Sequence, residues 1–276
     1  MNNLEGILVI NKPIGMTSRD VVNILNKELN TKKIGHTGTL DPIASGVLVV
    51  LIGKYTKLAN ELTNKDKEYI ATFDLGYLTD TLDTDGKILH EEKCNKTEEE
   101  IKKAVLSFKK TYMQEVPIYS AVKVKGKRLY KYAWDNEDIV LPSREVTIYD
   151  IEYLGKNKFK AKVSKGTYIR SLIRDIGLLL DTNATMTSLE RIKQGIFDIK
   201  DAYTLEDIKR DNYKLLTAKD LYKSIELSEE DYKKASNGVK LSLDTDDDIV
   251  LLTYQGKDIC LYKKDDNFYK MFIKFA

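Results

Sequence analysis

Residues 35–50, with the sequence GHTGTLDPIASGVLVV, constrain the fold of this chain more than any other segment. Three glycines in it allow backbone conformations and close approaches that side chains forbid, and Pro42 biases the preceding residue towards an extended conformation. The segment therefore predicts a shaped loop that holds Asp41 and leads into a buried strand over 45–52. Aspartate is also common in turns because it hydrogen-bonds locally, so the loop alone does not make Asp41 catalytic.

Local patterns predict a mixture of helices and strands. Thr17 with Asp20, and Thr97 with Glu100, have the spacing of a capping box, which predicts helices over 18–29 and from 97 onwards. Further helices are predicted over 54–62, 168–180, 204–209 and 228–236. Strands are predicted over 5–10, 45–52, 68–75, 145–154, 158–164, 248–254, 258–263 and 267–275.

Composition indicates a globular protein. The 276 residues are 42% hydrophobic and 32% charged. No apolar run reaches the roughly 18 residues of a membrane span, and the N-terminus lacks the apolar region of a signal peptide, so we expect a cytoplasmic protein. Cys94 and Cys260 have no second cysteine or histidine at ligand spacing, so no metal site is predicted.

Positive charge is concentrated in two windows, although the formal net charge is only +2. Residues 155–174 contain seven lysines and arginines and no acidic residue, and residues 107–134 contain seven against one glutamate. Both windows also carry aromatic residues. Cations that pair with phosphates and rings that stack on bases are typical of RNA-binding surfaces, whereas the alternative is a solvated lysine-rich face.

The Asp41 loop resembles the catalytic motif of the TruB family, the bacterial tRNA pseudouridine-55 synthases. Other motifs of that family follow in the same order, and together the matches span most of residues 5–200. They are NKPxGMTS from Asn11, KEY from Lys67, TDTxDxDG from Thr79, PxYSAxK from Pro117 and SKGTYIRSL from Ser164.

The resemblance implies an α+β protein with the pseudouridine synthase fold, in which helices and loops flank a mixed, largely antiparallel central sheet. It implies a catalytic domain over 1–220, with an RNA-clamping insertion at about 117–141. A small PUA-like β domain, which would also bind RNA, is implied over 221–276.

The reaction that the resemblance implies is the isomerisation of uridine to pseudouridine at position 55 of the tRNA T-loop. The bond from the ribose to N1 of the base is replaced by a bond to C5, so no cofactor is needed. Asp41 is implied as nucleophile or essential base. Attack on C1′, attack on C6 and removal of the C2′ proton all remain open.

Two further catalytic residues are implied by position in the motifs. Each route needs an ionised carboxylate, and Arg170 is the candidate cation that offsets the cost of enclosing it. Phosphate contact is the alternative role for Arg170. Tyr69 is implied to stack on the uracil and to relay the proton that leaves C5, although a strand tyrosine is otherwise usually a core residue.

The other implied site residues bind the substrate. A stacked base has to flip out before it can react, and His36 is the candidate to fill the gap that it leaves. From the residues alone, His36 is equally well a loop hydrogen-bonding group or a pH-sensitive base. Tyr168 and Leu189 match positions that line the uracil pocket, with core packing as the alternative for Leu189, and Lys12 and Lys123 complete the substrate-binding set.

The expected partner is the tRNA T-arm, recognised without a guide RNA by a monomer that has no membrane contact. Two other functions fit the same motifs. One is a guide-RNA-dependent pseudouridine synthase, for which the C-terminal segment looks too short. The other is a non-catalytic protein that binds or folds tRNA.

Overall fold

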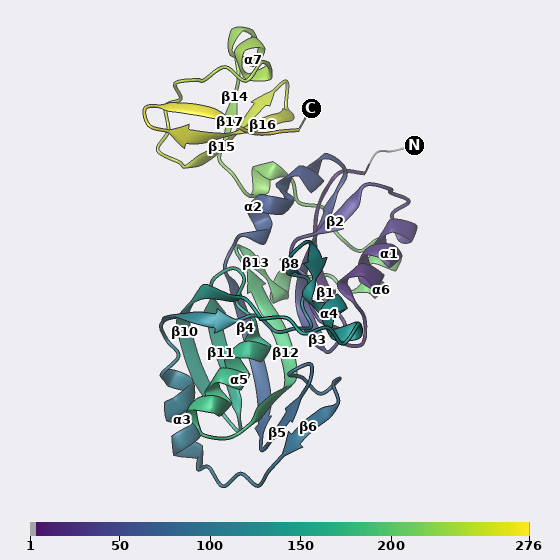
Figure 1. Cartoon of the computed structure of the whole chain (residues 1–276). Helices are drawn as coiled ribbons and strands as arrows, with labels where there is room; N and C mark the ends of the chain where they lie inside the picture. Colours follow the sequence, from purple (N-terminus) through teal and green to yellow (C-terminus); the bar gives the residue numbers. More distant parts are fainter. Residues whose placement is uncertain (1–3, 276) are drawn as a thin grey trace.

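The computed structural model describes residues 4–275. Its main sheet has nine strands in the order β1-β3-β12-β4-β11-β10-β7, with β2 paired to β3 and β13 paired to β12 (Figure 1). The strands are β1 (Gly6–Lys12), β2 (Ile34–His36), β3 (Ala44–Ile52), β4 (Lys67–Leu75), β7 (Thr111–Glu115), β10 (Ser143–Gly155), β11 (Lys158–Val163), β12 (Ala184–Gln194) and β13 (Phe197–Asp198).

The sheet is mixed because a single pairing on this path, β3 with β12, is parallel. That pairing aligns Leu189 with Ala44 and Arg191 with Gly46. It joins the strand that follows the Asp41 loop to a strand almost 150 residues further along the chain. The predicted mixed, largely antiparallel central sheet is confirmed.

Two helices, α3 (Glu98–Leu106) and α5 (Ile169–Leu179), cover one face of β4, β11 and β12, and α1 (Ser18–Glu28) covers β1 and β3. Both predicted capping boxes are present, at Thr17 with Asp20 and at Thr97 with Glu100. The predicted helix over 54–62 is instead a 3₁₀ segment followed by a short α-helix. The shorter helical elements are η1 (Gly53–Leu58), α2 (Ala59–Thr63), α4 (Leu129–Trp134), η2 (Ile199–Asp201), α6 (Leu205–Lys209), η3 (Ala218–Asp220) and α7 (Glu229–Ser236).

A separate four-stranded sheet forms at the C-terminal end, at the top of Figure 1. Its strands are β14 (Ser224–Glu226), β15 (Ile249–Tyr254), β16 (Lys257–Asp265) and β17 (Phe268–Lys274). It packs on η1, where Tyr55 is 3% exposed and donates a hydrogen bond of 2.6 Å to Asp258. The predicted small β unit is confirmed, while the domain boundary at residue 220 stays a prediction.

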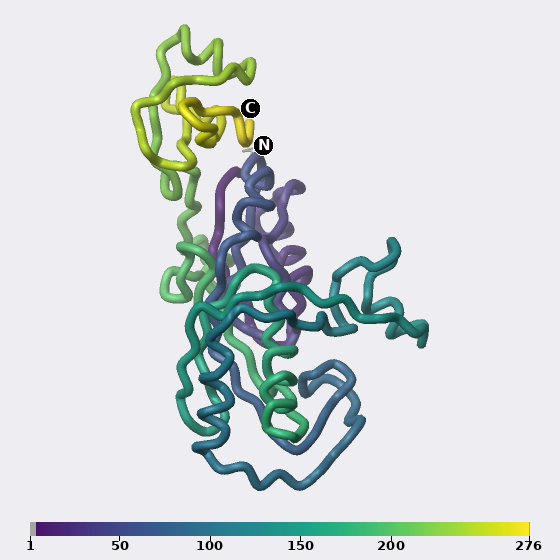
Figure 2. Tube along the Cα trace, turned by 60° about the vertical axis from the view of Figure 1, so that its left-hand side comes forward, coloured from purple at the N-terminus to yellow at the C-terminus, as the bar shows by residue number. Residues whose placement is uncertain are grey.

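Two small hairpins extend from the main sheet. The first is β5 (Tyr77–Thr79) with β6 (Ile88–Glu91). The second is β8 (Lys123–Val124) with β9 (Lys127–Arg128), which together with α4 forms the segment that projects from the body in Figure 2. This segment falls within the predicted insertion over 117–141. Its only apolar anchor among residues 4–275 is a small cluster around Val116, Leu129 and Tyr132.

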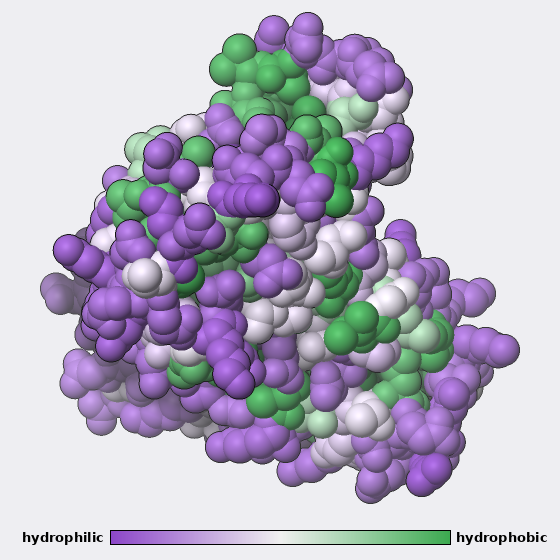
Figure 3. All heavy atoms as spheres, turned by 90° about the horizontal axis from the view of Figure 1, so that it is seen from below, coloured by the Kyte–Doolittle hydropathy of each residue, from purple (hydrophilic) through white to green (hydrophobic). Residues whose placement is uncertain are grey.

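The surface carries no broad apolar band on the face shown in Figure 3, where hydrophilic side chains dominate and hydrophobic ones gather in small separate groups. Within residues 4–275, no helix is both long and apolar enough to cross a membrane.

Candidate active site

A cleft of about 1320 Å³ opens between the Asp41 loop, the insertion and the strands β4 and β12. Six of the residues predicted for the site line it, although they come from five separate parts of the chain. These six are Asp41, Tyr69, Lys123, Tyr168, Arg170 and Leu189.

Side chains from outside the Asp41 loop fix its shape. The hydroxyl of Ser18 donates to the carbonyl of Leu40 at 3.2 Å and accepts from its N–H at 2.8 Å. Arg191, which is 1% exposed, donates to the carbonyls of Val47 and Gly38 at 2.7 and 3.1 Å. The loop is therefore held on both sides of Asp41 by side chains that lie far away in the sequence.

Close approach between β3 and β12 requires a glycine at position 46. Gly46 has a φ of +101°, and a Cβ added there would lie 2.3 Å from the carbonyl oxygen of Arg191. A side chain would force apart the parallel pair that carries the loop. This glycine therefore determines the geometry of the site without contacting the cleft.

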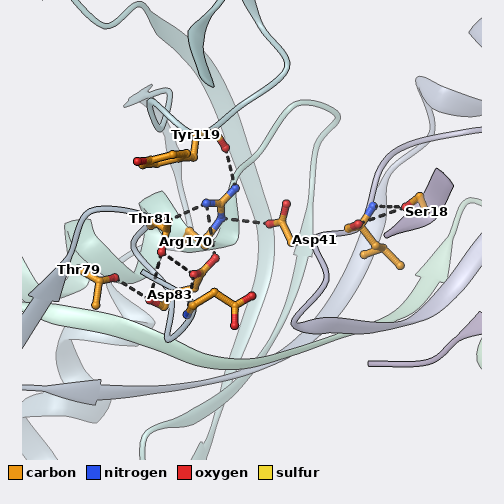
Figure 4. Close-up of polar contacts among 9 residues, drawn as sticks. Ser18, Asp41, Thr79, Thr81, Asp83, Tyr119 and Arg170 are labelled. Carbon is orange, nitrogen blue, oxygen red and sulfur yellow. Dashed lines mark hydrogen bonds and ion pairs between the residues drawn. The ribbon is translucent and has the colours of Figure 1, made fainter. Parts of the chain in front are cut away.

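Asp41 forms an ion pair with Arg170. The distance from Nε of Arg170 to Oδ2 of Asp41 is 3.1 Å, and the side chains are 6% and 36% exposed respectively (Figure 4). Arg170 also donates to the carbonyls of Thr81 and Tyr119 at 2.7 and 3.1 Å. A longer contact with Asp83 brings to four the number of groups that fix the guanidinium. Asp41 keeps an open side towards the cleft.

Asp83 is a site residue that sequence reasoning missed. It lies on the other side of Arg170 from Asp41, with its Oδ2 3.6 Å from Nη1, and it accepts a hydrogen bond of 2.6 Å from Thr81 (Figure 4). Burial raises the pKa of Asp83, while the Thr81 hydroxyl and the Arg170 charge act in the opposite direction. The acidic TDTxDxDG motif contained the signal, but only the fold shows which carboxylate faces Arg170.

Tyr69 and Leu189 form adjacent parts of the cleft floor. Tyr69 on β4 pairs with Arg191 on β12, and Leu189 pairs with Ala71, so the side chains share one face of the sheet. Each is 8% exposed and also belongs to the main core cluster. Both residues therefore pack in the core and line the cleft, while their contact with uracil stays a prediction.

Tyr168 is positioned by the start of α5. It is the N-cap of that helix, and its N–H donates to the side chain of Gln114 at 2.8 Å. The guanidinium of Arg144 lies 5.6 Å from the centre of the Tyr168 ring. Tyr168 lines the cleft, two residues before Arg170.

The structure does not bring Lys12 and His36 to the wall of the cleft. Lys12 is 0% exposed and donates to the carbonyls of Pro13 and Met16 at 2.8 and 2.6 Å, so it holds the turn before α1. His36 lies on β2 opposite Val50, and its Nδ1 is buried without a hydrogen-bond partner among residues 4–275. Burial, followed by the charge of Arg191, lowers the pKa of His36.

Cations outnumber carboxylates on the wall of the cleft. Asp41 and Glu145 are the two acidic residues that line it. The positively charged side chains there are Lys67, Lys123, Arg128, Arg144, Lys165, Arg170 and Arg191. A cleft with this balance attracts a polyanion.

Two buried lysines make the stability of the protein depend on pH. Burial lowers the pKa of both Lys12 and Lys67 from 10.5 to about 8. Between pH 8 and 10.5 the unfolded chain therefore binds more protons than the folded protein. The free energy of unfolding should rise with pH in that window, by up to about 1.4 kcal/mol per pH unit for each of the two lysines.

Urea unfolding at pH 7.5, 8.5 and 9.5 measures this effect. Lys67→Met should reduce the rise, whereas Lys65→Met, which changes a half-exposed lysine two residues away, should leave it unchanged. The range stops below pH 10 because buried tyrosines such as Tyr55 and Tyr112 have raised pKa values and oppose the trend once unfolded tyrosines ionise. A stability that is flat from pH 7.5 to 9.5 would contradict the assignment.

Known families match most of the chain. Residues 26–169 match a family model described as TruB family pseudouridylate synthase (N terminal domain), and residues 170–230 match one described as tRNA pseudouridylate synthase B C-terminal domain. The chain is 42% identical to the tRNA pseudouridine synthase B of Clostridium tetani, over 96% of this chain and 94% of that protein. It is 40% identical to the protein of that name from Lactobacillus acidophilus, over 97% of each.

The fold also matches a solved structure. A chain in the crystal structure of a Cbf5-Nop10-Gar1 complex superposes with a TM-score of 0.70 at 24% sequence identity, over 98% of this chain and 85% of that chain. At this identity the likeness concerns the fold alone. Together with the observed sheet and the family matches, it confirms the predicted fold class.

Proposed function

Because the chain belongs to the TruB family of pseudouridylate synthases, we propose that it isomerises uridine to pseudouridine at position 55 in the T-loop of tRNA. The observation that carries this proposal is the ion pair between Asp41 and Arg170 at the wall of a cationic cleft. The name that the curated relatives share supports tRNA as the substrate.

Asp41 acts as the nucleophile or essential base. The guanidinium at 3.1 Å holds the carboxylate in place, and the open side of Asp41 lets a ribose or a uracil reach its oxygens. The bond from C1′ to N1 breaks, a bond from C1′ to C5 forms, N1 gains a proton and C5 loses one. Since the atoms balance within the nucleotide, this chemistry needs no added group.

Tyr69 and Leu189 hold the uracil. The base lies against the Tyr69 ring on the floor of the cleft, with Leu189 beside it, and the hydroxyl of Tyr69 relays the C5 proton. A base reaches this floor only when it is flipped out of its stack, at a cost of a few kcal/mol. Contacts between the cationic wall and the RNA backbone offset that cost.

The insertion forms one wall of the cleft, next to the floor made by β4 and β12. Lys123, Arg128 and Trp134 all line the cleft, and the Trp134 side chain is nevertheless 68% exposed. An exposed aromatic ring next to cations suits contact with the bases and phosphates of a folded T-arm. Recognition of this kind follows the shape and backbone of the RNA, which supports action without a guide RNA.

Tritium release tests the proposed function. The substrate is an unmodified tRNA transcript that carries [5-³H]uridine, and the control transcript has another base in place of the T-loop uridine. Release from the first transcript alone, by the protein without any added RNA, is the expected result. Tight binding of the transcript without release would instead favour a tRNA-binding protein or a guide-dependent enzyme.

A further inference from the structure

The floor of the cleft changes from apolar to positively charged side chains along the strands β4 and β12. Cross-strand pairs run from Ala71 with Leu189, through Tyr69 with Arg191, to Lys67 with Gln194. The first part is apolar, whereas the second part presents a guanidinium and an ammonium group. Lys67 and Tyr69 lie two residues apart on one face, which separates them by about 7 Å along the strand. A nucleotide likewise has a flat base that can stack on an apolar surface at one end and an anionic phosphate at the other.

Arg191 and Lys67 are buried cations that have no carboxylate partner in the part of the chain that the structure describes. Lys67 is 8% exposed, and its ammonium donates to the carbonyls of Thr63 and Lys65. Arg191 uses Nε and Nη2 for the carbonyls of Val47 and Gly38. Within residues 4–275, Nη1 of Arg191 has no hydrogen-bond acceptor, and neither side chain forms an ion pair. Arg170, in contrast, faces two carboxylates in the same cleft.

This arrangement is costly in the free protein. Burial lowers the pKa of Lys67, and the charge of Arg191 lowers it further. The two enclosed charges repel each other, and neutral carbonyl groups compensate only part of the lost hydration. Both residues nevertheless line the cleft, so an anion can reach them. A bound anion would satisfy the free donor of Arg191 and remove the repulsion.

We propose that Arg191 and Lys67 form a subsite for one phosphodiester group of the RNA, adjacent to the nucleotide whose base lies against Tyr69 and Leu189. The subsite deepens the proposed function and rests on it. Arg170 is paired with Asp41 and Asp83, so it is not the phosphate ligand. Arg170 positions the carboxylate, whereas Arg191 and Lys67 bind the phosphate. The phosphate contact fixes the flipped nucleotide from its backbone while the floor holds its base.

A purely structural role is the competing explanation for Lys67. Its ammonium ties down the turn between α2 and β4, so its loss could loosen that turn without any effect on a phosphate. The experiment therefore measures the number of phosphate contacts as well as the affinity. Removing one contact lowers the slope of log Kd against log salt concentration by about 0.7 to 0.9.

The test compares Lys67→Met with the wild-type protein, with Lys67→Arg and with Lys65→Met. The probe is an RNA hairpin of the T-arm sequence, together with two versions that carry one uncharged methylphosphonate linkage directly 5′ or 3′ of the target uridine. We expect Lys67→Met to bind the natural hairpin roughly 10-fold more weakly, with the reduced salt slope. Lys67→Arg should restore both, and Lys65→Met should change neither.

The neutral linkage supplies the decisive comparison. On one of the two methylphosphonate hairpins, Lys67→Met should bind as well as the wild-type protein, because the phosphate charge that Lys67 meets is already absent. An unchanged salt slope, or an equal loss of affinity on all three hairpins, would overturn the subsite. Wild-type tritium release from the natural hairpin reports separately on the proposed function, so failure of the subsite leaves that result intact.

Discussion

The Asp41→Asn variant is expected to lose pseudouridine formation by at least about 10⁴-fold while its affinity for tRNA stays within a few-fold of the wild-type value. The amide has the size of the carboxylate and can still accept a hydrogen bond from Nε of Arg170, so the cleft keeps its shape. It lacks the negative charge and the basicity that every route to the product requires. Single-turnover tritium release and filter binding measure the two quantities.

Asp150→Asn is the matched control for Asp41→Asn. Asp150 is an exposed carboxylate that pairs with Lys109 at 2.8 Å on the outside of the sheet, so its change should affect neither turnover nor binding. Turnover of Asp41→Asn near the wild-type rate would remove Asp41 from the mechanism. A parallel collapse of tRNA binding would show that the variant had disturbed the cleft instead.

The Arg170→Met variant should be damaged in both activity and stability. The change leaves Asp41 and the buried Asp83 without their shared cation, and it leaves the carbonyls of Thr81 and Tyr119 without a donor. Removing one partner of a buried ion pair typically costs about 3–5 kcal/mol of stability. Loss of the aligned cation should lower kcat by roughly 10² to 10³-fold.

Asp83→Asn separates these two effects. The amide oxygen can keep the hydrogen bonds from Thr81 and from the N–H of Asp85, so stability should change little. Arg170 loses one of its two charged neighbours and is held less firmly, which should lower kcat by roughly 10 to 100-fold with a smaller change in KM. Wild-type kcat in Asp83→Asn would show that Asp83 does not position Arg170.

A surface pair provides the control for stability. Arg210 lies 3.4 Å from Glu206 on α6, where the two side chains are 73% and 57% exposed. Arg210→Met should cost no more than about 1 kcal/mol in urea unfolding, because exposed ion pairs contribute little. If Arg170→Met lost as little stability as Arg210→Met, the ion pairs of Arg170 with Asp41 and Asp83 would not stabilise the fold as expected.

Short-range features were predictable from the sequence. The capping boxes at Thr17 and Thr97 act within four residues, so the starts of α1 and α3 follow from local hydrogen bonding. The loop around Asp41 was predictable for the same reason, since glycine and proline restrict the backbone wherever they occur. The family motifs added the fold, and with it an expectation that Asp41, Tyr69 and Arg170 lie together.

One local prediction failed because tertiary contacts decide the outcome. Residues 54–62 have a helical pattern, yet the first half forms a 3₁₀ segment, where Tyr55 packs against Phe275 and bonds to Asp258. Lys12 lies in a motif expected to bind substrate; in the structure it is buried and donates to nearby carbonyls, and its contact with substrate stays a prediction.

The sequence by itself determined the loop chemistry, the capped helices and the family of this protein, because each of these depends on neighbouring residues or on whole motifs. Only the tertiary structure decided that Asp83 faces Arg170. It likewise decided that Arg191 and Lys67 are enclosed with no paired carboxylate among residues 4–275. These relations depend on the register between β4 and β12 and on the parallel pair of β3 with β12. These registers join residues more than 100 positions apart, and they are fixed only when one face of each strand is buried in the common core.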